Sequence, residues 1–299
     1  MSTEGTSRRF AELDLWPTAD AVRAMFEGQL AAAEAVQPQI GPLAQAAEAA
    51  AERLRHPEGR LVYAGAGTSG RLAVLDGTEL EPTFGWARER LVYAIAGGMA
   101  ALSGSVENAE DDEESACVLV RSAKLGANDV AIGVSASGTT PFTVAALTEA
   151  RQRGTLTVGI ASNAGSPLLA AAEHPIFLDT GAEVIAGSTR MKAGTAQKIA
   201  LNLLSSAIML RLGRVHGGLM VDMRISNRKL RARAVAMVAE ISGADRASAE
   251  AALAAAGDDI KLAVLIAMGI APDRARDILL RSGDNLRTAI AAARDALPG

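Results

Sequence analysis

Residues 61–71 read LVYAGAGTSGR, and they indicate the class of fold more clearly than any other part of the chain. A short apolar run leads into a glycine-rich turn, and the sequence after the turn has helical spacing. A strand, a Gly-x-Gly-x-x-Gly turn and a helix in this order form the first half of a βαβ unit. The backbone amides of such a turn, together with the positive end of the helix, predict an anion-binding site.

Four more short apolar runs follow along the chain, and each ends in glycine or serine or leads into a polar turn. The five runs are residues 61–64, 91–96, 130–134, 156–160 and 176–178. Most of the stretches between them are long enough for one helix, so we predict an α/β fold with a doubly wound, five-stranded parallel sheet. Ligands of such sheets bind beyond the carboxyl ends of the strands. The loops expected to line the site start at Gly65, Gly97, Ser135, Ser162 and Thr180.

Helical sequence flanks the predicted sheet on both sides. Residues 19–55 have helical spacing with a break near Pro38, which predicts two helices, and a long helix is expected over residues 190–212. Beyond residue 231, two Gly-Asp pairs at a spacing of 26 residues each offer a helix-ending glycine and then an N-cap. We therefore predict an N-terminal helical arm (1–58), an α/β domain (59–230) and a small helical domain (231–299). The last is either a packing or dimer-stabilising cap or a peptide-binding module similar to ubiquitin-associated domains.

The composition of the chain restricts its class of function. It has 299 residues, and its hydrophobic fraction is 49% with only 3% aromatic residues, so the core must consist mainly of Ala, Val, Leu and Ile. The net charge of −4 gives no electrostatic reason to expect nucleic acid or a membrane surface as partner. Cys117 is the single cysteine, and the three histidines lack metal-ligand spacing. We expect a cytoplasmic protein whose partners are small molecules.

A second hydroxyl-rich loop, SASGTTP at residues 135–141, follows the third predicted strand. Its hydroxyls could bind a phosphate without a lysine, although serine and threonine also serve as ordinary N-caps. A dinucleotide would require an acidic residue after the second strand, and residues 93–98 (YAIAGG) contain none. An unrelated tight turn at the glycine loop is the remaining alternative. Two such loops at one sheet edge favour a small phosphorylated ligand.

Carboxylates lie next to both predicted loops. Residues 76–81 read DGTELE and precede Pro82, which is expected to end the first helix, and residues 107–114 read ENAEDDEE. Glu107 and Glu110 are three residues apart, so they should share one helix face and could point inward together, whereas the acidic residues after them suit a solvated surface. A further segment, residues 181–195, combines small residues with Arg190 and Lys192. It could approach a charged ligand or simply form a loop and an N-cap.

With these segments, the chain resembles the N-acetylmuramic acid 6-phosphate etherases, a family of the sugar isomerase (SIS) superfamily. The most specific segments are residues 65–71 (GAGTSGR), 75–79 (LDGTE), 107–111 (ENAED), 187–195 (GSTRMKAGT) and 219–222 (LMVD). Glucokinase regulatory proteins are similar in several of these segments and bind sugar phosphates without known turnover. A non-catalytic phosphosugar-binding regulatory protein is therefore one alternative, and a phosphosugar isomerase is another.

The resemblance implies an enzyme that removes D-lactate from N-acetylmuramate 6-phosphate during recycling of cell-wall sugars, giving N-acetylglucosamine 6-phosphate. An alkyl ether resists direct hydrolysis. In the open-chain sugar, however, the lactyl ether lies β to an aldehyde, so loss of the carbon-2 proton can expel lactate. Elimination followed by addition of water needs one base and one acid. We therefore expect no cofactor and no metal.

The resemblance also implies roles for individual residues. Glu79 corresponds to the acid/base at the leaving lactate and the incoming water, and Glu110 to the second catalytic carboxylate, with the carbon-2 base as its expected role. Which of the two is acid and which is base stays open. Substrate binding is expected at Gly67, Thr68, Ser69, Glu107, Ser135, Ser137, Thr140, Ser188 and Lys192, the last two toward the sugar or the lactyl carboxylate. A homodimer is implied as well, because sites of this superfamily are commonly completed across a two-fold interface, here through the helix at 190–212.

Overall fold

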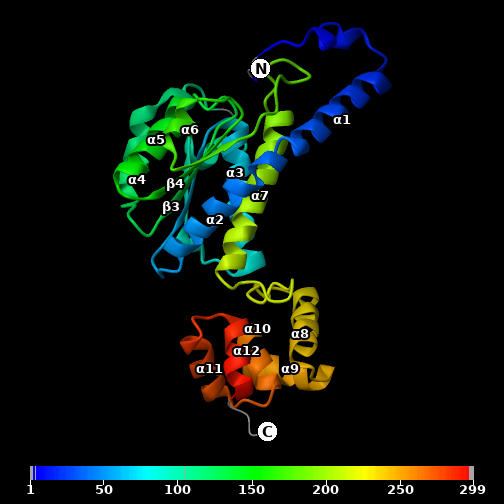
Figure 1. The fold of residues 1–299 in the computed structure, drawn as a ribbon, viewed down its shortest axis with the longest axis vertical. Coiled ribbons are helices and arrows are strands. Elements are labelled where there is room, and N and C mark those ends of the chain that lie inside the picture. Colours follow the sequence, from blue (N-terminus) through cyan, green and yellow to red (C-terminus); the bar gives the residue numbers. More distant parts are fainter. Residues whose placement is uncertain (1–2, 4, 105, 296–299) are drawn as a thin grey trace. The chain divides into compact units, whose positions relative to one another are not determined.

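The computed structural model describes residues 3, 5–104 and 106–295, and Figure 1 shows the fold. The chain divides into two compact units. The first consists of Met1–Thr78 and Arg88–Ile208, and the second of Glu79–Ala87 and Met209–Gly299. Among the described residues, no helix has the length and apolar character needed to cross a membrane.

The first unit is built on a five-stranded parallel sheet with strand order β2-β1-β3-β4-β5, as the sequence predicts. Strand order reverses between β1 and β3, since the chain adds β2 on one side of β1 and then β3 on the other. This change of order opens a crevice at the carboxyl ends of β1 and β3, where ligands of doubly wound sheets bind. The strands are β1 (Leu61–Gly65), β2 (Leu91–Ile95), β3 (Val130–Val134), β4 (Leu156–Ala161) and β5 (His174–Phe177).

Helices cover both faces of the sheet (Figure 1). On one face, α4 (Glu113–Ser122), α5 (Pro141–Gln152) and α6 (Pro167–Ala171) pack against alternate strand residues through a core rich in alanine. On the other face lie α2 (Ile40–Leu54), α3 (Gly67–Phe84) and α7 (Lys192–Arg211). The helix α1 (Thr18–Glu34) precedes α2, so both N-terminal helices are confirmed. Short 3₁₀ turns are η1 (Arg8–Phe10), η2 (Leu13–Leu15), η3 (Gln37–Gln39), η4 (Arg88–Arg90), η5 (Gly98–Leu102) and η6 (Ala109–Asp111).

A buried carboxylate fixes α3 against the sheet and α7. Asp76 is 4% exposed and accepts hydrogen bonds from the Tyr63 hydroxyl (2.8 Å), the Asn202 amide (2.6 Å) and the Ser205 hydroxyl (3.1 Å). Burial, with the nearby Asp76 as a second cause, raises the pKa of Tyr63 well above its usual value, so its hydroxyl stays protonated at neutral pH. A buried carboxylate is tolerated only with such partners, so this group holds the helix whose first turn borders the sheet edge.

The end of α3 differs from the expectation that Pro82 terminates it. The helix continues through Pro82 to Phe84. Proline disturbs the turn on its N-terminal side, and this close to the end only the last turn is affected. The Pro82 carbonyl accepts a hydrogen bond from the backbone amide of Arg224 at 3.1 Å, so it does not depend on a helical partner.

In its described residues, up to residue 295, the second unit contains five helices in addition to the end of α3. They are α8 (Arg228–Ser242), α9 (Arg246–Ala255), α10 (Ile260–Ala267), α11 (Pro272–Arg281) and α12 (Leu286–Asp295). Gly257 and Gly283 adopt left-handed backbone conformations, as expected for helix-ending glycines. The caps lie one residue after each Gly-Asp pair: Asp259 accepts a hydrogen bond from the amide of Leu262, and Asn285 caps α12 in the same way.

Candidate active site

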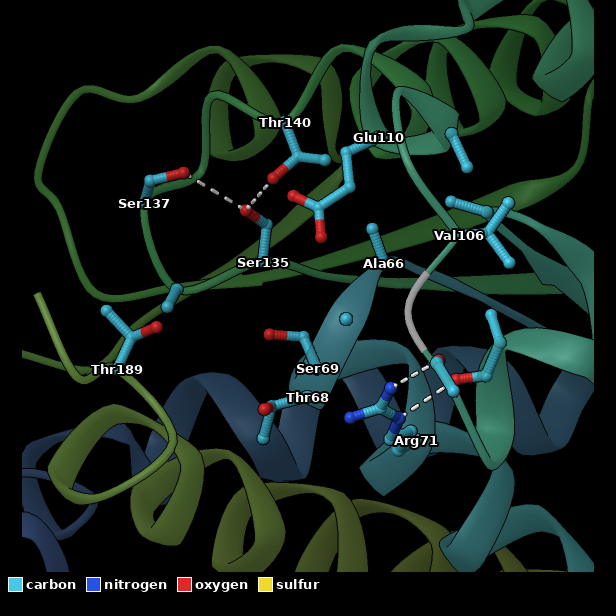
Figure 2. Close-up of a pocket in the computed structure, with 16 residues that line it drawn as sticks. Ala66, Thr68, Ser69, Arg71, Val106, Glu110, Ser135, Ser137, Thr140 and Thr189 are labelled. Atoms are coloured by element: carbon cyan, nitrogen blue, oxygen red, sulfur yellow. Dashed lines mark hydrogen bonds between the residues drawn. The ribbon is translucent and has the colours of Figure 1, made fainter.

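A cavity of about 420 Å³ lies at the carboxyl ends of β1, β2 and β3 (Figure 2). Its walls come from the first turn of α3, the loop after β2, the loop after β3, and Thr189 from the loop after β5. Of the five loops expected at this edge, the one starting at Ser162 contributes no lining residue, and Thr180 itself does not reach the cavity. The loop before α6, and α6 itself, are hydrogen-bonded to the Ser137–Gly138 turn. The side-chain amide of Asn163 donates to the Ser137 carbonyl at 3.1 Å, and the backbone amide of Leu168 donates to the Gly138 carbonyl at 3.0 Å. This loop therefore supports the wall from behind.

The first turn of α3 brings a carboxylate close to a helix N-terminus. Gly67 has φ 52°, and a Cβ added there would lie 2.9 Å from Oε1 of Glu110. Glycine therefore suits the left-handed backbone, and its lack of a side chain leaves the carboxylate room to approach. The positive end of a helix stabilises a nearby negative charge, so Glu110 is held in the cavity by this turn.

The hydroxyl groups of the loop after β3 form one connected cluster. The hydroxyl of Ser135 lies 2.8 Å from that of Thr140 and 3.4 Å from that of Ser137, and it accepts a hydrogen bond from the Gly138 amide at 3.0 Å. Thr140 stands at the N-cap of α5, yet its side chain makes no capping hydrogen bond. The ordinary N-cap alternative therefore does not describe Thr140. In Figure 2, the carboxylate of Glu110 points toward the side of the cavity where Ser135 and Thr140 lie.

Ser69 connects the cavity to a buried amide on α7. Its hydroxyl donates to Oε1 of Gln197 at 3.0 Å, and Gln197 is fully buried. The Nε2 atom of Gln197 has no hydrogen-bond partner within the described part of the chain. A buried donor without a partner costs about 1–3 kcal/mol, so such a group merits a functional explanation.

Arg71 lines the cavity as well, although sequence reasoning did not select it. Its guanidinium donates to the carbonyl oxygens of Ala101 (2.9 Å) and Gly104 (2.7 Å), as the dashed lines in Figure 2 show. These bonds fasten the loop after β2, which leads on to Glu110. Its place at the end of the glycine-loop motif could have indicated this, because a side chain one turn into the helix lies near the carboxyl ends of the strands.

Glu107 and Glu110 do not share a helix face. Asn108 adopts a left-handed conformation (φ 58°), and Glu110 lies in the short turn η6 that follows. The expected helical spacing is wrong here because the left-handed conformation of Asn108 interrupts right-handed helical geometry between the two glutamates. Both side chains are exposed, but Glu110 lines the cavity and Glu107 does not.

Glu79 lies on α3, twelve residues after Gly67, and is exposed. At a rise of about 1.5 Å per residue, roughly 18 Å of helix separate the two positions. Glu79 is not among the residues that line the cavity. One chain therefore does not bring Glu79 and Glu110 together.

The start of α7 is stabilised by a carboxylate from its own loop. Glu183, which is 1% exposed, accepts hydrogen bonds from the amides of Lys192 (2.9 Å) and Ala193 (3.0 Å). The Lys192 ammonium donates to the Ala182 carbonyl at 2.9 Å, and neither Lys192 nor Ser188 lines the cavity. The N-cap alternative therefore describes this segment. The capping residue, Glu183, was not predicted, since it lies nine residues before the helix.

Two family models and several curated proteins match this chain. The glucokinase regulatory protein N-terminal SIS domain matches residues 43–151, and the SIS domain matches residues 106–207. The chain is 49% identical to the N-acetylmuramic acid 6-phosphate etherase of Deinococcus radiodurans, covering 95% of this chain and 93% of the relative. It is 46% identical to the enzyme of that name from Streptomyces avermitilis, covering 98% and 94%.

Among solved structures, the chain is similar in fold to a putative phosphosugar isomerase involved in capsule formation from Bacteroides fragilis. The TM-score is 0.50 at 21% identity, covering 68% of this chain and 99% of the other.

Proposed function

The chain belongs to the N-acetylmuramic acid 6-phosphate etherase family, and on that premise we propose that it cleaves the D-lactyl ether of N-acetylmuramate 6-phosphate. The products are D-lactate and N-acetylglucosamine 6-phosphate. The observation that carries the proposal is the carboxylate of Glu110, held at the Gly67 turn in a cavity walled by hydroxyl groups. A base, and donors for an anion, are the two requirements of this substrate.

The phosphate is bound by the hydroxyl cluster together with the first turn of α3. Ser135, Ser137 and Thr140 present connected hydroxyls, and the N-termini of α3 and α5 both border the same cavity. Thr68 and Ser69 add hydroxyls from the opposite wall. Charge-assisted hydrogen bonds to phosphate are strong, so no lysine is needed in this subsite.

Glu110 acts on the sugar carbon rather than on the phosphate. As a carboxylate it takes the carbon-2 proton of the open-chain aldehyde, and the electron pair forms the double bond between carbons 2 and 3 as lactate leaves with the ether oxygen. Water then adds at carbon 3, and carbon 2 receives a proton. Deuterium from the solvent should therefore appear at carbon 2, and water oxygen at carbon 3. Water oxygen in the lactate would contradict elimination.

Glu79 supplies the second carboxylate, and we assign it to a second copy of the chain. The length of α3 between Gly67 and Glu79, about 18 Å, keeps it from the cavity of its own chain. A homodimer whose two-fold axis brings the end of one α3 to the other subunit's cavity would complete two equivalent sites. Glu79 then protonates the leaving lactate and activates the incoming water.

The substrate is a phosphorylated fragment of the bacterial cell wall, and the product is a common amino-sugar phosphate. We accordingly assign the enzyme to the cytoplasmic recycling of peptidoglycan sugars.

Release of D-lactate, coupled to D-lactate dehydrogenase, tests the proposal. Stoichiometric D-lactate is expected from N-acetylmuramate 6-phosphate and none from the unphosphorylated sugar. Glu110→Gln should lower kcat about 10²-fold or more, as for loss of a general base. Asp111→Asn is the matched control, since Asp111 is the exposed neighbour that does not line the cavity. Binding of sugar phosphates without lactate release would instead identify a regulatory protein.

A further inference from the structure

The second unit contains more than the C-terminal part of the chain. Residues Glu79–Ala87 belong to it together with Met209–Gly299. The last turn of α3 and the turn after it are therefore held by the C-terminal helices and their connecting segment. Glu79 is the first residue of this portion, so contacts that fix the portion also influence the position of Glu79.

Arg214 holds the turn that follows α3. Its guanidinium donates to the carbonyl oxygens of Phe84 (2.9 Å) and Gly85 (3.3 Å) and lies 5.5 Å from the ring centroid of Trp86. Trp86 is fully buried. An arginine that both donates to carbonyls and stacks on an indole fixes backbone and side chain together. The turn is thus clamped at three consecutive residues.

Arg224 adds a second attachment on the same portion. Its backbone amide bonds to the Pro82 carbonyl, and its guanidinium forms an ion pair with Glu81. Gly85, with φ 60°, packs directly on the backbone carbonyl of Asp222. The segment from 214 to 224 therefore touches the portion 81–86 along most of its length.

Lys261 connects this segment to the core of the helical bundle. It is 1% exposed, and its ammonium lies 2.6 Å from Oδ2 of Asp222, 2.9 Å from Oδ2 of Asp284 and 2.8 Å from the Asp284 carbonyl. The same Asp222 oxygen lies 3.8 Å from Arg214. One partly buried carboxylate thus joins the lysine of α10 to the arginine that clamps the turn.

Stability alone does not explain a buried lysine at this position. Replacing a buried ion pair by apolar residues of similar volume is often neutral or stabilising, and α10 is otherwise strongly apolar. An ionic link does specify one geometry, because the ammonium must satisfy fixed acceptors. The link therefore suits a positioning task better than a packing task.

We propose that Lys261, Asp222 and Arg214 form a positioning relay by which the C-terminal helices hold the end of α3 and, with it, Glu79 in its catalytic orientation. This inference rests on the proposed role of Glu79. It gives the C-terminal helices a task in catalysis instead of the binding of a separate peptide. Lys261 and Arg214 are positioning residues, since neither contacts the cavity.

The test compares kcat for lactate release with the affinity for N-acetylglucosamine 6-phosphate in Lys261→Met, Arg214→Gln and the double variant. Each single variant should lower kcat about 10-fold or more, as for a misplaced catalytic group. Affinity should be unchanged, because the phosphate-binding wall belongs to the first unit. The double variant should fall no further than the worse single variant, because both changes break one relay.

The matched control is Arg231→Ala, which removes an exposed ion pair with Asp258 in the same unit and should leave kcat unchanged. If Lys261→Met unfolds the unit, Arg214→Gln still tests the relay, because it leaves Lys261 paired with Asp222. Unchanged kcat in the folded variants, or additive losses in the double variant, would overturn the relay. Absence of lactate release in the unaltered enzyme would instead overturn the proposed function.

Discussion

Gly67 illustrates how a missing side chain shapes the cavity. Gly67→Ala places a methyl carbon 2.9 Å from Oε1 of Glu110, so the carboxylate must shift, and it also strains a left-handed backbone. We expect a fold that is retained and a kcat that falls about 10²-fold, the usual loss for a displacement near 1 Å. Gly41→Ala is the control, because a Cβ there meets nothing within 4 Å. Unaltered kcat in Gly67→Ala would remove Glu110 from the reaction.

The proton on Ser69 should depend on Gln197. In the structure, the amide oxygen of Gln197 accepts the hydrogen bond that the Ser69 hydroxyl donates, so this hydroxyl cannot also donate to a phosphate. An amide with nitrogen and oxygen exchanged would donate to Ser69 through Nε2, which now lacks a partner, and would leave the Ser69 proton for the ligand.

The substitution Gln197→Glu tests this dependence. A buried carboxyl group can donate to Ser69 when protonated, but when ionised it can only accept and also repels the phosphate. KM should therefore rise with pH in the variant, while kcat changes less. Measurement of KM between about pH 5.5 and 8.5 tests whether substrate binding depends on the Gln197–Ser69 hydrogen bond. A pH profile of KM parallel to that of the unaltered enzyme would contradict the dependence.

Cys117 should be a slow nucleophile. Burial, followed by the negative charge of Glu149, raises the pKa of its thiol, so the reactive thiolate is scarcer at neutral pH than in an ordinary cysteine. Iodoacetamide should label it more slowly than it labels glutathione, and the labelling rate should increase with pH beyond the ordinary thiol range. Lactate release should survive labelling, because Cys117 does not line the active-site cavity. Loss of activity in step with labelling would contradict this.

At the scale of elements, the amino ends of β1 and β3 carry an ion pair at the end of the sheet opposite the candidate active site. Asp129, which is 4% exposed, accepts two hydrogen bonds from the Arg60 guanidinium (3.1 and 2.8 Å) and others from the amides of Arg60 and Gly126. Asp129→Ala should lower the free energy of unfolding by about 3 kcal/mol, since it leaves a partly buried arginine unpaired. Denaturant titration measures this. KM and kcat at 25 °C should stay unchanged; a large change in KM would show that the two edges are coupled.

Most elements were predictable because their signals are local. The five strands and the paired N-terminal helices follow from apolar runs and helical spacing, and both are confirmed. Local signals fail where a single backbone conformation or a distant partner determines the outcome. The left-handed conformation of Asn108 interrupts helical geometry between Glu107 and Glu110, and Glu183 caps a helix that starts nine residues later.

The candidate site shows the same division. Gly67, Thr68, Ser69, Glu110 and three hydroxyl residues of the β3 loop were selected from motifs, and all line one cavity. Arg71 and Gln197 were missed, because their importance lies in hydrogen bonds to residues far along the chain. The roles of all these residues stay predictions until variants are measured.

At the scale of the whole molecule, the proposed dimer predicts complementation between inactive variants. Glu79→Gln and Glu110→Gln should each be inactive alone. In a hybrid dimer, one of the two cavities combines an intact Glu110 with an intact Glu79 from the other subunit. Random pairing should thus restore about one quarter of the unaltered activity. Sedimentation checks that dimers form, and hybrid dimers without activity would place both glutamates in one chain's site.

The division of the chain into units also limits how its parts can be recombined, by gene fusion or by engineering. Because residues Glu79–Ala87 belong with Met209–Gly299, the chain enters the second unit, leaves it and enters it again. No single cut of the backbone separates the two units. A gene fusion that exchanged only the C-terminal segment would leave behind the turn containing Trp86, to which that segment is fitted. The helical tail can therefore be transplanted into another scaffold only as two pieces, with the end of α3 as the first.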